Sequence, residues 1–173
     1  GPTLFLIFIN DMPEIVKNIV KMFADDAKIY ARVNTIQEAA NLQNDINNLQ
    51  KWSEKWQLKF NRAKCKHMHL GKDQQFSKYY MKIGDVETTI QEVNEEKDLG
   101  VVMDKNLKFV SHIQTVVKKA NRILGVIKRT FKYIDKDVFL NLYKALVRPH
   151  LEYASNVWSV IYKKDAIPIE NIQ

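Results

Sequence analysis

Cysteine is almost absent from this chain. Among the 173 residues only Cys65 carries a thiol, and the four histidines are scattered along the sequence. A single cysteine excludes an internal disulfide framework, and it also excludes a cysteine-rich zinc site. His67 and His69 alternate along a predicted strand and share one of its faces, but no further metal ligand stands near them. We therefore expect both histidines to be structural.

Long apolar runs are missing as well. A membrane-spanning helix needs about 20 consecutive apolar residues, whereas the most apolar run, residues 4–9, is much shorter and lacks a basic flank. Nothing in the sequence directs the chain into a membrane or out of the cell, so we expect an intracellular protein, nuclear or cytoplasmic, with no membrane partner. With 46% apolar residues, the chain can still bury the core of one or two domains.

One segment contains almost no acidic residues. Residues 105–148 carry 11 Lys and Arg against 2 Asp and Glu, a net charge of +9, whereas residues 1–104 carry 14 against 15. The whole chain has a net charge of +7, so this segment holds the entire basic excess. Such an asymmetry is typical of a surface that meets a polyanion.

Two adjacent carboxylates, Asp25 and Asp26, lie between the apolar runs 19–24 and 27–33. Both runs are rich in Ile, Val, Phe and Tyr, which predicts a hairpin. Carboxylates at a rigid hairpin tip can hold hard divalent cations, and two such ions about 4 Å apart can stabilise the attacking and leaving oxygens of a phosphoryl transfer. The alternative is a solvated turn, because Asp is a common turn residue.

Five segments, in this order, resemble the reverse transcriptase of non-LTR retrotransposons. They are residues 1–13, Phe23-Ala24-Asp25-Asp26, Asn61-Arg62-Ala63-Lys64-Cys65, Asp98-Leu99-Gly100-Val101 and residues 147–158. The first is similar to the helix before the catalytic hairpin of that family. The second resembles its aromatic-x-Asp-Asp box, and the third its Asn-x-x-Lys-Thr segment. The last two are similar to the Leu-Gly turn of the primer-grip region and to the Arg-Pro-x-x-Glu-Tyr segment after the palm.

The resemblance implies an RNA-directed DNA polymerase that extends a DNA primer on an RNA template, using deoxynucleotides and two Mg²⁺ ions. It implies that Asp25 is a metal ligand and that Asp26 assists at the same site. Lys64 resembles the lysine proposed to protonate or stabilise the departing pyrophosphate, a task suited to a flexible cation. A lysine after a turn is also common on protein surfaces, and this alternative stays open.

The same resemblance implies contacts with the primer. We expect Phe23 to pack beside the primer end, with an ordinary core aromatic as the alternative. Leu99 and Gly100 resemble the primer grip, where a glycine lets another backbone approach closely. A turn glycine without a ligand is the competing interpretation of Gly100.

Parts of the family pattern are not found in these residues. The family has a third catalytic Asp on a strand upstream of the hairpin, and it has nucleotide-binding fingers; neither is found here. Asp11 does not replace the third Asp, because the family pattern does not use this position so. We therefore expect a fragment of a longer polyprotein that is inactive in isolation, because both the metal geometry and the positioning of the nucleotide are incomplete. The alternative is a non-catalytic nucleic-acid-binding module derived from a retroelement.

The expected fold class is α+β, with a partial palm over residues 1–104 and a basic, helical, thumb-like region over residues 105–173. We predict a buried helix over residues 1–12, ending before Pro13. A capping box at Thr35 and Glu38 opens a helix that runs to about Trp56. Both Trp52 and Trp56 are expected to be buried against the sheet. Predicted strands cover residues 65–70, 79–83, 86–90 and 97–103, with Gly84-Asp85 as the turn of a second hairpin.

A basic amphipathic helix is predicted over residues 109–131. Its apolar face comprises Ile113, Val116, Ala120, Ile123, Leu124, Ile127 and Phe131. The opposite side carries Lys118, Lys119, Arg122, Lys128, Arg129 and Lys132. At ~1.5 Å per residue, the stripe from Lys118 to Lys132 is about 21 Å long, enough to follow several phosphates. The ordinary alternative is a solvated face, but the shortage of acidic partners favours nucleic acid.

Overall fold

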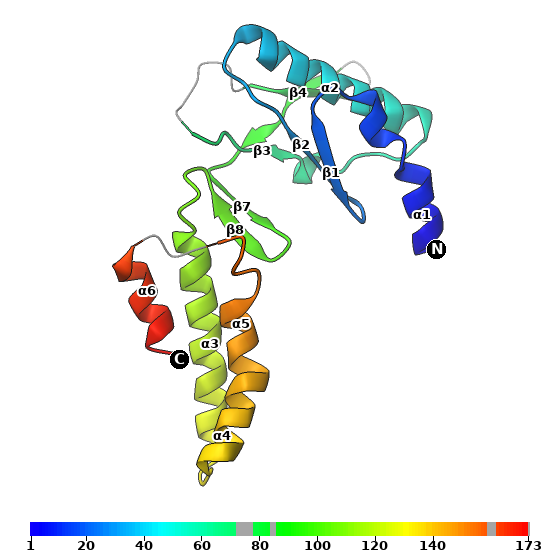
Figure 1. The fold of residues 1–173 in the computed structure, drawn as a ribbon. Helices are drawn as coiled ribbons and strands as arrows, with labels where there is room; N and C mark the ends of the chain where they lie inside the picture. Colours follow the sequence, from blue (N-terminus) through cyan, green and yellow to red (C-terminus); the bar gives the residue numbers. More distant parts are fainter. Residues whose placement is uncertain (72–77, 84–85, 159–161, 173) are drawn as a thin grey trace. The chain divides into compact units, whose positions relative to one another are not determined.

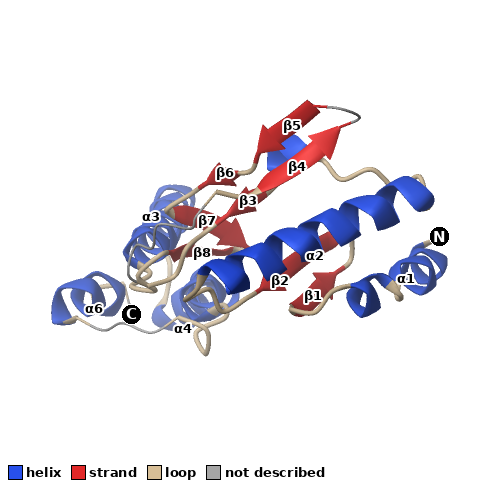
Figure 2. Cartoon of the chain, turned by 90° about the horizontal axis from the view of Figure 1, so that it is seen from above, coloured by secondary structure: helices blue, strands red, loops and turns tan. Residues whose placement is uncertain are grey.

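The chain folds into helices and short strands, and in its described part the strands lie between Ile19 and Asp104 (Figure 1). This computed structural model describes all residues except 72–77, 84–85, 159–161 and 173. The mixture of helices and antiparallel hairpins agrees with the predicted α+β class (Figure 2). The chain separates into two compact units, residues 1–93 and residues 94–173. The structural division therefore comes before the hairpin at 95–104, which the sequence placed in the first region.

The first unit contains helices, three-residue and four-residue 3₁₀ turns, and paired strands. Its elements are α1 Pro2–Ile9, the 3₁₀ turn Met12–Ile15, β1 Ile19–Phe23, β2 Asp26–Tyr30, α2 Ile36–Lys55, the 3₁₀ turn Arg62–Lys64, β3 Lys66–His67, β4 Tyr80–Ile83, β5 Val86–Thr89 and β6 Gln91–Glu92. The predicted hairpin at residues 79–90 is confirmed to within a residue at each end. Its turn, Gly84-Asp85, lies outside the described residues.

Helix α2 begins where the capping box predicts. The backbone N–H of Glu38 donates to Thr35 Oγ1 at 3.2 Å, and the N–H of Thr35 donates to Glu38 Oε2 at 3.1 Å. Two orphan donors of the first turn are thereby satisfied. One face of α2 buries Leu49 and Trp52 against Ile9 and Met12, which form a core of the first unit. The prediction of a buried Trp56 is wrong, because this residue caps the helix at 40% exposure.

Two glutamines of α2 pair with the backbone of β4. Gln43 donates from Nε2 to the carbonyl of Tyr80 and accepts from the N–H of Tyr80, both at 2.9 Å. Gln50 does the same for Lys82, accepting from its N–H at 2.7 Å and donating to its carbonyl. The side-chain amides thus satisfy backbone groups of β4 that its partner β5 does not use.

The N-terminal apolar block is shorter and more exposed than predicted. Helix α1 ends at Ile9, and Pro13 lies inside the following 3₁₀ turn. Ile9 is buried, but Leu4 is 71% and Ile7 is 68% exposed, so the prediction of a buried helix is wrong for most of its residues. The block lacks amphipathic alternation, and a helix that is apolar on every side cannot bury all its faces against one neighbour.

Two other strand predictions need correction. Only Lys66–His67 of residues 65–70 is a strand, and it pairs in parallel with β6. Residues 97–103 do not form one strand: they belong to a hairpin in the second unit, made of β7 Glu95–Asp98 and β8 Val101–Asp104. The reversal occurs at Leu99-Gly100, where both residues have positive φ, +43° and +90°. Such a turn suits the twist of a hairpin.

The other elements that the structure describes in the second unit are helices. They are α3 Val110–Thr130, α4 Lys136–Leu142, the π-helical segment Tyr143–Val147, α5 Arg148–Glu152 and α6 Lys163–Glu170. Helix α3 packs against α5 and α6 through a core that includes Val116, Ala120, Ile127, Val147 and Leu151 (Figure 1). The π turn, in which the N–H of Arg148 donates to the carbonyl of Tyr143, comes just before Pro149. Proline cannot donate in a regular helix, and the wider turn accommodates it.

Candidate functional site

The candidate metal site lies at the tip of the β1–β2 hairpin. These strands are antiparallel, and their last pair is Phe23 with Asp26, so the loop consists of Ala24 and Asp25. Ala24 takes a left-handed φ of +52°. The predicted hairpin exists, but its turn falls one residue earlier than Asp25-Asp26. Asp25 is thus in the turn, whereas Asp26 is the first residue of β2.

The two faces of this hairpin have different environments. Directly paired residues of antiparallel strands share a face, so Met22 and Ala27 lie on one side, and Phe23 and Asp26 lie on the other. Met22 and Ile29 pack against the core of the first unit. Phe23 is 61% exposed, which excludes the core-aromatic alternative. Its neighbour across the hairpin is Asp26, whereas Asp25 lies in the turn.

A buried carboxylate anchors the hairpin to α2. Asp45 is 1% exposed. Its oxygens accept from the N–H of Lys17 at 3.0 Å, from the N–H of Asn18 at 2.9 Å and from Asn18 Nδ2 at 2.7 Å. These bonds hold the residues that lead directly into β1. Sequence reasoning missed this role, although an acid inside the apolar stripe of α2, next to Ile46, was a usable signal.

The hairpin carboxylates keep their oxygens available. Among the residues that the structure describes, no hydrogen bond or ion pair engages Asp25 or Asp26, and both are exposed. The same part of the chain contains no group of three or more His, Cys, Asp and Glu placed to hold a metal ion. Asp11 is engaged elsewhere, because Trp52 Nε1 donates to its Oδ1 at 3.0 Å. The hairpin can therefore supply two oxygen ligands, and a complete shell needs others.

Lys64 lies on the 3₁₀ turn Arg62–Lys64, where its N–H donates to the carbonyl of Asn61 at 3.0 Å. Its side chain is exposed, and in the described ranges it forms no hydrogen bond or ion pair with the hairpin carboxylates. The neighbouring Cys65 is half-buried, and burial raises the pKa of its thiol. A raised thiol pKa makes Cys65 a poor nucleophile at neutral pH.

Leu99 and Gly100 form the turn of the β7–β8 hairpin, and Tyr153 holds this turn. The Tyr153 hydroxyl donates to the carbonyl of Leu99 at 2.9 Å. A Cβ atom on Gly100 would lie 3.1 Å from Cε1 of Tyr153, so the ring sits directly on the glycine. Two segments singled out separately in the sequence, 98–101 and 147–158, are therefore one structural unit.

The support of this turn continues into α3. Trp158 Nε1 donates to the carbonyl of Tyr153 at 2.9 Å, and its ring meets His112 edge-on at a centroid distance of 4.9 Å. His112 Nδ1 accepts from the N–H of Val102 in β8 at 3.3 Å. Burial lowers the pKa of His112, whose side chain is 3% exposed. The neutral imidazole is the form that can accept this bond.

The basic helix is confirmed as an element, with one correction. Helix α3 spans Val110–Thr130, and its apolar face is buried or half-buried apart from Phe131, which is 43% exposed. The predicted cations are all exposed: Lys118, Lys119, Arg122, Lys128, Arg129 and Lys132. Lys132 lies beyond the helix, because Phe131 ends it with extended dihedral angles. The helical stripe therefore runs from Lys118 to Arg129, about 16 Å at ~1.5 Å per residue.

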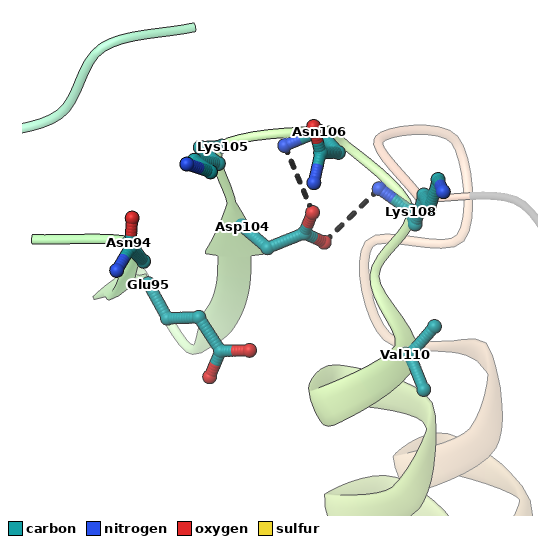
Figure 3. A pocket seen from close by; sticks show the side chains of 7 residues that line it. All are labelled: Asn94, Glu95, Asp104, Lys105, Asn106, Lys108 and Val110. Carbon is teal, nitrogen blue, oxygen red and sulfur yellow. Dashed lines mark hydrogen bonds between the residues drawn. The ribbon is translucent and has the colours of Figure 1, made fainter. Parts of the chain in front are cut away.

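A shallow pocket of about 210 Å³ lies in the second unit (Figure 3). Asp104 and Glu95 line it, but their carboxylates are already engaged. Asp104 accepts from the N–H groups of Asn106, Lys108 and Phe109 at 2.7–3.0 Å. Glu95 accepts from the Ser111 hydroxyl at 2.6 Å. These bonds fix the entry into α3, and they engage both oxygens of Asp104 and one oxygen of Glu95.

Comparison with known proteins decides the family. Residues 1–134 match the profile described as "Reverse transcriptase (RNA-dependent DNA polymerase)". The chain belongs to the reverse transcriptase family. This match includes the β1–β2 hairpin, the Lys64 turn, the Leu99-Gly100 turn and the whole of α3. Reverse transcriptases use divalent metal ions and bind nucleic acid, so the types of ligand inferred from the hairpin and from the basic segment fit the family.

Retrotransposon polymerases are similar over nearly all of this reverse transcriptase segment. The RNA-directed DNA polymerase from mobile element jockey of Drosophila funebris is 27% identical over 92% of the chain, and that of Drosophila melanogaster is 25% identical over all of it. The probable RNA-directed DNA polymerase from transposon X-element of Drosophila melanogaster is 23% identical over the whole chain. These are non-LTR elements, so the resemblance inferred from the sequence is confirmed.

The chain spans about a fifth of the length of these relatives, 18–20%. No solved structure matches it significantly. In the part of the chain that the structure describes, no helix is both long and apolar enough to cross a membrane.

Proposed function

We propose that the chain contributes the catalytic hairpin, primer grip and thumb of an RNA-directed DNA polymerase. The polymerase extends a DNA primer on an RNA template by phosphoryl transfer from deoxynucleotides. The observation that carries this proposal is the hairpin of a reverse transcriptase family member that offers Asp25 and Asp26 with free oxygens at its exposed tip. In this assignment residues 1–104 belong to the palm and residues 105–173 to the thumb.

Asp25 and Asp26 would hold Mg²⁺ in the complete polymerase. Exposed carboxylates without other partners fit a hard cation that prefers oxygen ligands. When bound, a pair of such ions stabilises negative charge on the attacking and leaving oxygens. Since the described residues offer no third ligand nearby, the remaining ligand must come from another part of the polymerase. The isolated chain is therefore expected to be inactive.

The other candidate residues have roles around this centre. Lys64, exposed on its turn, would stabilise the departing pyrophosphate. Phe23, on the same face as Asp26, would pack beside the primer end, which its exposure supports. Leu99 and Gly100 would contact the primer backbone. The Tyr153 ring covers the Cα side of Gly100, so the primer would approach the turn from a different side.

The cations of α3 would contact the phosphate backbone. Lys118, Arg122 and Arg129 fall within about 40° of one another at 100° per residue, and no ion pair engages them among the described residues. Each phosphate that they neutralise adds nearly one unit to the slope of log K against log salt for duplex DNA. A non-catalytic binding module would use the same surface, so this surface does not separate the two proposals.

A primer-extension assay tests the catalytic role. In a full-length polymerase that carries this segment, Asp25→Asn should abolish extension, because an amide oxygen binds Mg²⁺ far more weakly than a carboxylate does. The matched control is Glu87→Gln, an exposed acid in the other hairpin of the first unit, which should retain activity. Extension at the unmodified rate by Asp25→Asn would refute the metal role and favour the binding module.

A binding assay on this chain tests the cationic surface independently. A triple variant with Lys118, Arg122 and Arg129 changed to Ala should bind a primer–template duplex at least tenfold more weakly, with a salt slope lower by two to three units, about one for each phosphate contact. Retention of the full slope would exclude this face of α3 as the contact.

A further inference from the structure

The loop between α3 and α4, residues 131–135, presents an unusually exposed aromatic side chain. Tyr133 is 98% exposed, and no hydrogen bond or ring contact engages it in the described part of the chain. The loop is at the end of α3 that lies away from the β7–β8 hairpin (Figure 1). None of the roles assigned above uses this side chain.

The residues around Tyr133 are fixed, so the ring projects from an anchored loop. Ile134 packs against the core of the second unit. Asp135 caps α4, with its carboxylate accepting from the N–H of Val138 at 2.8 Å. On the other side, the N–H of Phe131 donates to the carbonyl of Ile127 at 3.0 Å and closes α3. An anchored loop loses little conformational entropy when its ring is covered by a ligand.

The surroundings of Tyr133 are cationic. Lys128, Arg129, Lys132 and Lys136 are all exposed within five residues of it. The nearby acids are Asp135, which is engaged in capping, and Asp137 in the first turn of α4. An exposed aromatic ring among cations is the arrangement by which proteins hold single-stranded nucleic acid, because the ring stacks on a base while the cations neutralise phosphates. In a duplex the base faces are already stacked, so a free ring favours an unpaired strand.

We propose that Tyr133 stacks on an unpaired base of single-stranded nucleic acid, with Lys128 and Lys132 neutralising adjacent phosphates. The inference rests on the proposed nucleic-acid binding by the second unit, and it adds a single-strand contact that is distinct from the α3 face at Lys118 and Arg122. The strand that suits this contact in a reverse transcriptase is an unpaired part of the template.

The test measures fluorescence anisotropy with mixed-sequence single-stranded RNA, single-stranded DNA of the same sequence and a blunt duplex, over a series of salt concentrations. Tyr133→Ala should weaken single-strand binding at least about fivefold, the lower end of the effect of removing one stacked base. Blunt-duplex binding should stay within about twofold. The salt slope should not change, because tyrosine is neutral. Lys132→Ala should lower that slope by about 0.7 for the single strand.

Two controls separate a stack from a change in folding. Tyr133→Phe keeps the ring and should bind like the unmodified chain. Tyr162→Ala removes another exposed tyrosine of the same unit, one that lies near Lys164, with 5.5 Å between the ammonium and the ring centroid. This variant should also bind normally.

The outcomes distinguish this proposal from the proposed function. If Tyr133→Ala binds single strands normally while the Lys118, Arg122 and Arg129 triple variant loses affinity, the stack is overturned and the α3 surface stands. If Tyr133→Ala weakens blunt-duplex binding as much as single-strand binding, the contact is not a base stack. If the triple variant and Tyr133→Ala both bind normally, both proposals fail.

Discussion

Gly100 is the residue whose replacement should most directly disturb the second unit. Its φ of +90° is unfavourable for any L side chain, and a Cβ atom would press against the Tyr153 ring at 3.1 Å. We expect Gly100→Ala to lower the free energy of unfolding of this unit by about 1–3 kcal/mol. Amide hydrogen exchange in α3 and β8 measures that free energy for the second unit separately.

Gly125 is the matched control for this substitution. It lies inside α3, and a Cβ atom there would meet nothing within 4 Å. Gly125→Ala should therefore raise the free energy of unfolding by about 0.5–1 kcal/mol, because alanine has the higher helix propensity. Equal effects of the two substitutions would contradict the interpretation of the Leu99-Gly100 turn.

His112 should make the stability of the second unit depend on pH. Its pKa is lowered by burial, so in the folded state it stays neutral at pH values where the unfolded chain, with a pKa near 6.5, takes up a proton. Stability is therefore complete above about pH 6.5 and falls as the pH decreases below it. Urea unfolding between pH 5 and 8, with amide hydrogen exchange in α3 as the probe, measures this loss of stability.

A substitution at His112 separates its contribution from that of His150. The pKa of His150 is lowered by burial and by the charge of Lys119, so it acts in the same direction. His112→Gln keeps a side-chain acceptor for the N–H of Val102 and cannot titrate. It should flatten the pH dependence, and an unchanged profile would assign the effect to His150 or to other groups.

At the scale of elements, Asp45 links the β1–β2 hairpin to α2. Asp45→Ala removes the buried carboxylate and leaves the N–H groups of Lys17 and Asn18, which are partly buried at these bonds, without their acceptor. We expect this substitution to lower the free energy of unfolding by about 2–4 kcal/mol. Hydrogen bonds to a charged acceptor contribute more than neutral ones, and the two donors lose their partner. Faster amide exchange in β1 and β2 than in β4 and β5 would show that the tether acts on this hairpin.

The control for Asp45 is Asn44→Ala on the exposed side of the same helix. It should change exchange in β1 and β2 very little. If Asp45→Ala behaves like Asn44→Ala, the carboxylate does not hold the hairpin.

The elements differ in how well local sequence predicts them. The capping box of α2 and the apolar face of α3 are set by residues within one or two helical turns, and both were predicted correctly. The strand predicted over residues 97–103 did not allow for the β7–β8 reversal, and only the family resemblance indicated a turn at Leu99-Gly100. Leu99 adopts a left-handed φ that leucine rarely takes, and its stabilising partner Tyr153 lies 54 residues away, so the local pattern did not predict the reversal. The Asp45 tether was missed for the same reason, since its partners are 27 and 28 residues distant.

The candidate site shows the same division. The Asp-Asp pair, Lys64, Leu99-Gly100 and the α3 cations could be named from the sequence, because each is a local pattern. The sequence could not predict which side chains share a face, because the turn lies one residue earlier than expected and Asp26 is in the strand beside Phe23. Register depends on tertiary packing of Met22 and Ile29, and a one-residue difference reverses the faces.

At the scale of the whole molecule, α1 should promote self-association. Leu4 and Ile7 lie three residues apart on one side of the helix, and both are largely exposed. Adjacent apolar side chains in water favour contact with another apolar surface. The double variant Leu4→Lys and Ile7→Lys should sediment as a monomer at concentrations where the unmodified chain associates.

Asn10→Lys serves as the control for charge alone. Asn10 is exposed and follows the end of α1, so this variant adds a positive charge without removing apolar surface. It should associate like the unmodified chain in sedimentation velocity experiments. Equal sedimentation of all three proteins would assign the association to another surface or show that none occurs.

The amide pairs of Gln43 and Gln50 with β4 also bear on association. An edge strand normally exposes alternate N–H and C=O groups that can recruit a strand from a second molecule. On β4 those of Tyr80 and Lys82 are already occupied by side chains of α2. Side chains of the helix therefore occupy edge groups of β4 that a further strand would otherwise use. They hinder the addition of a strand from a second molecule at this edge.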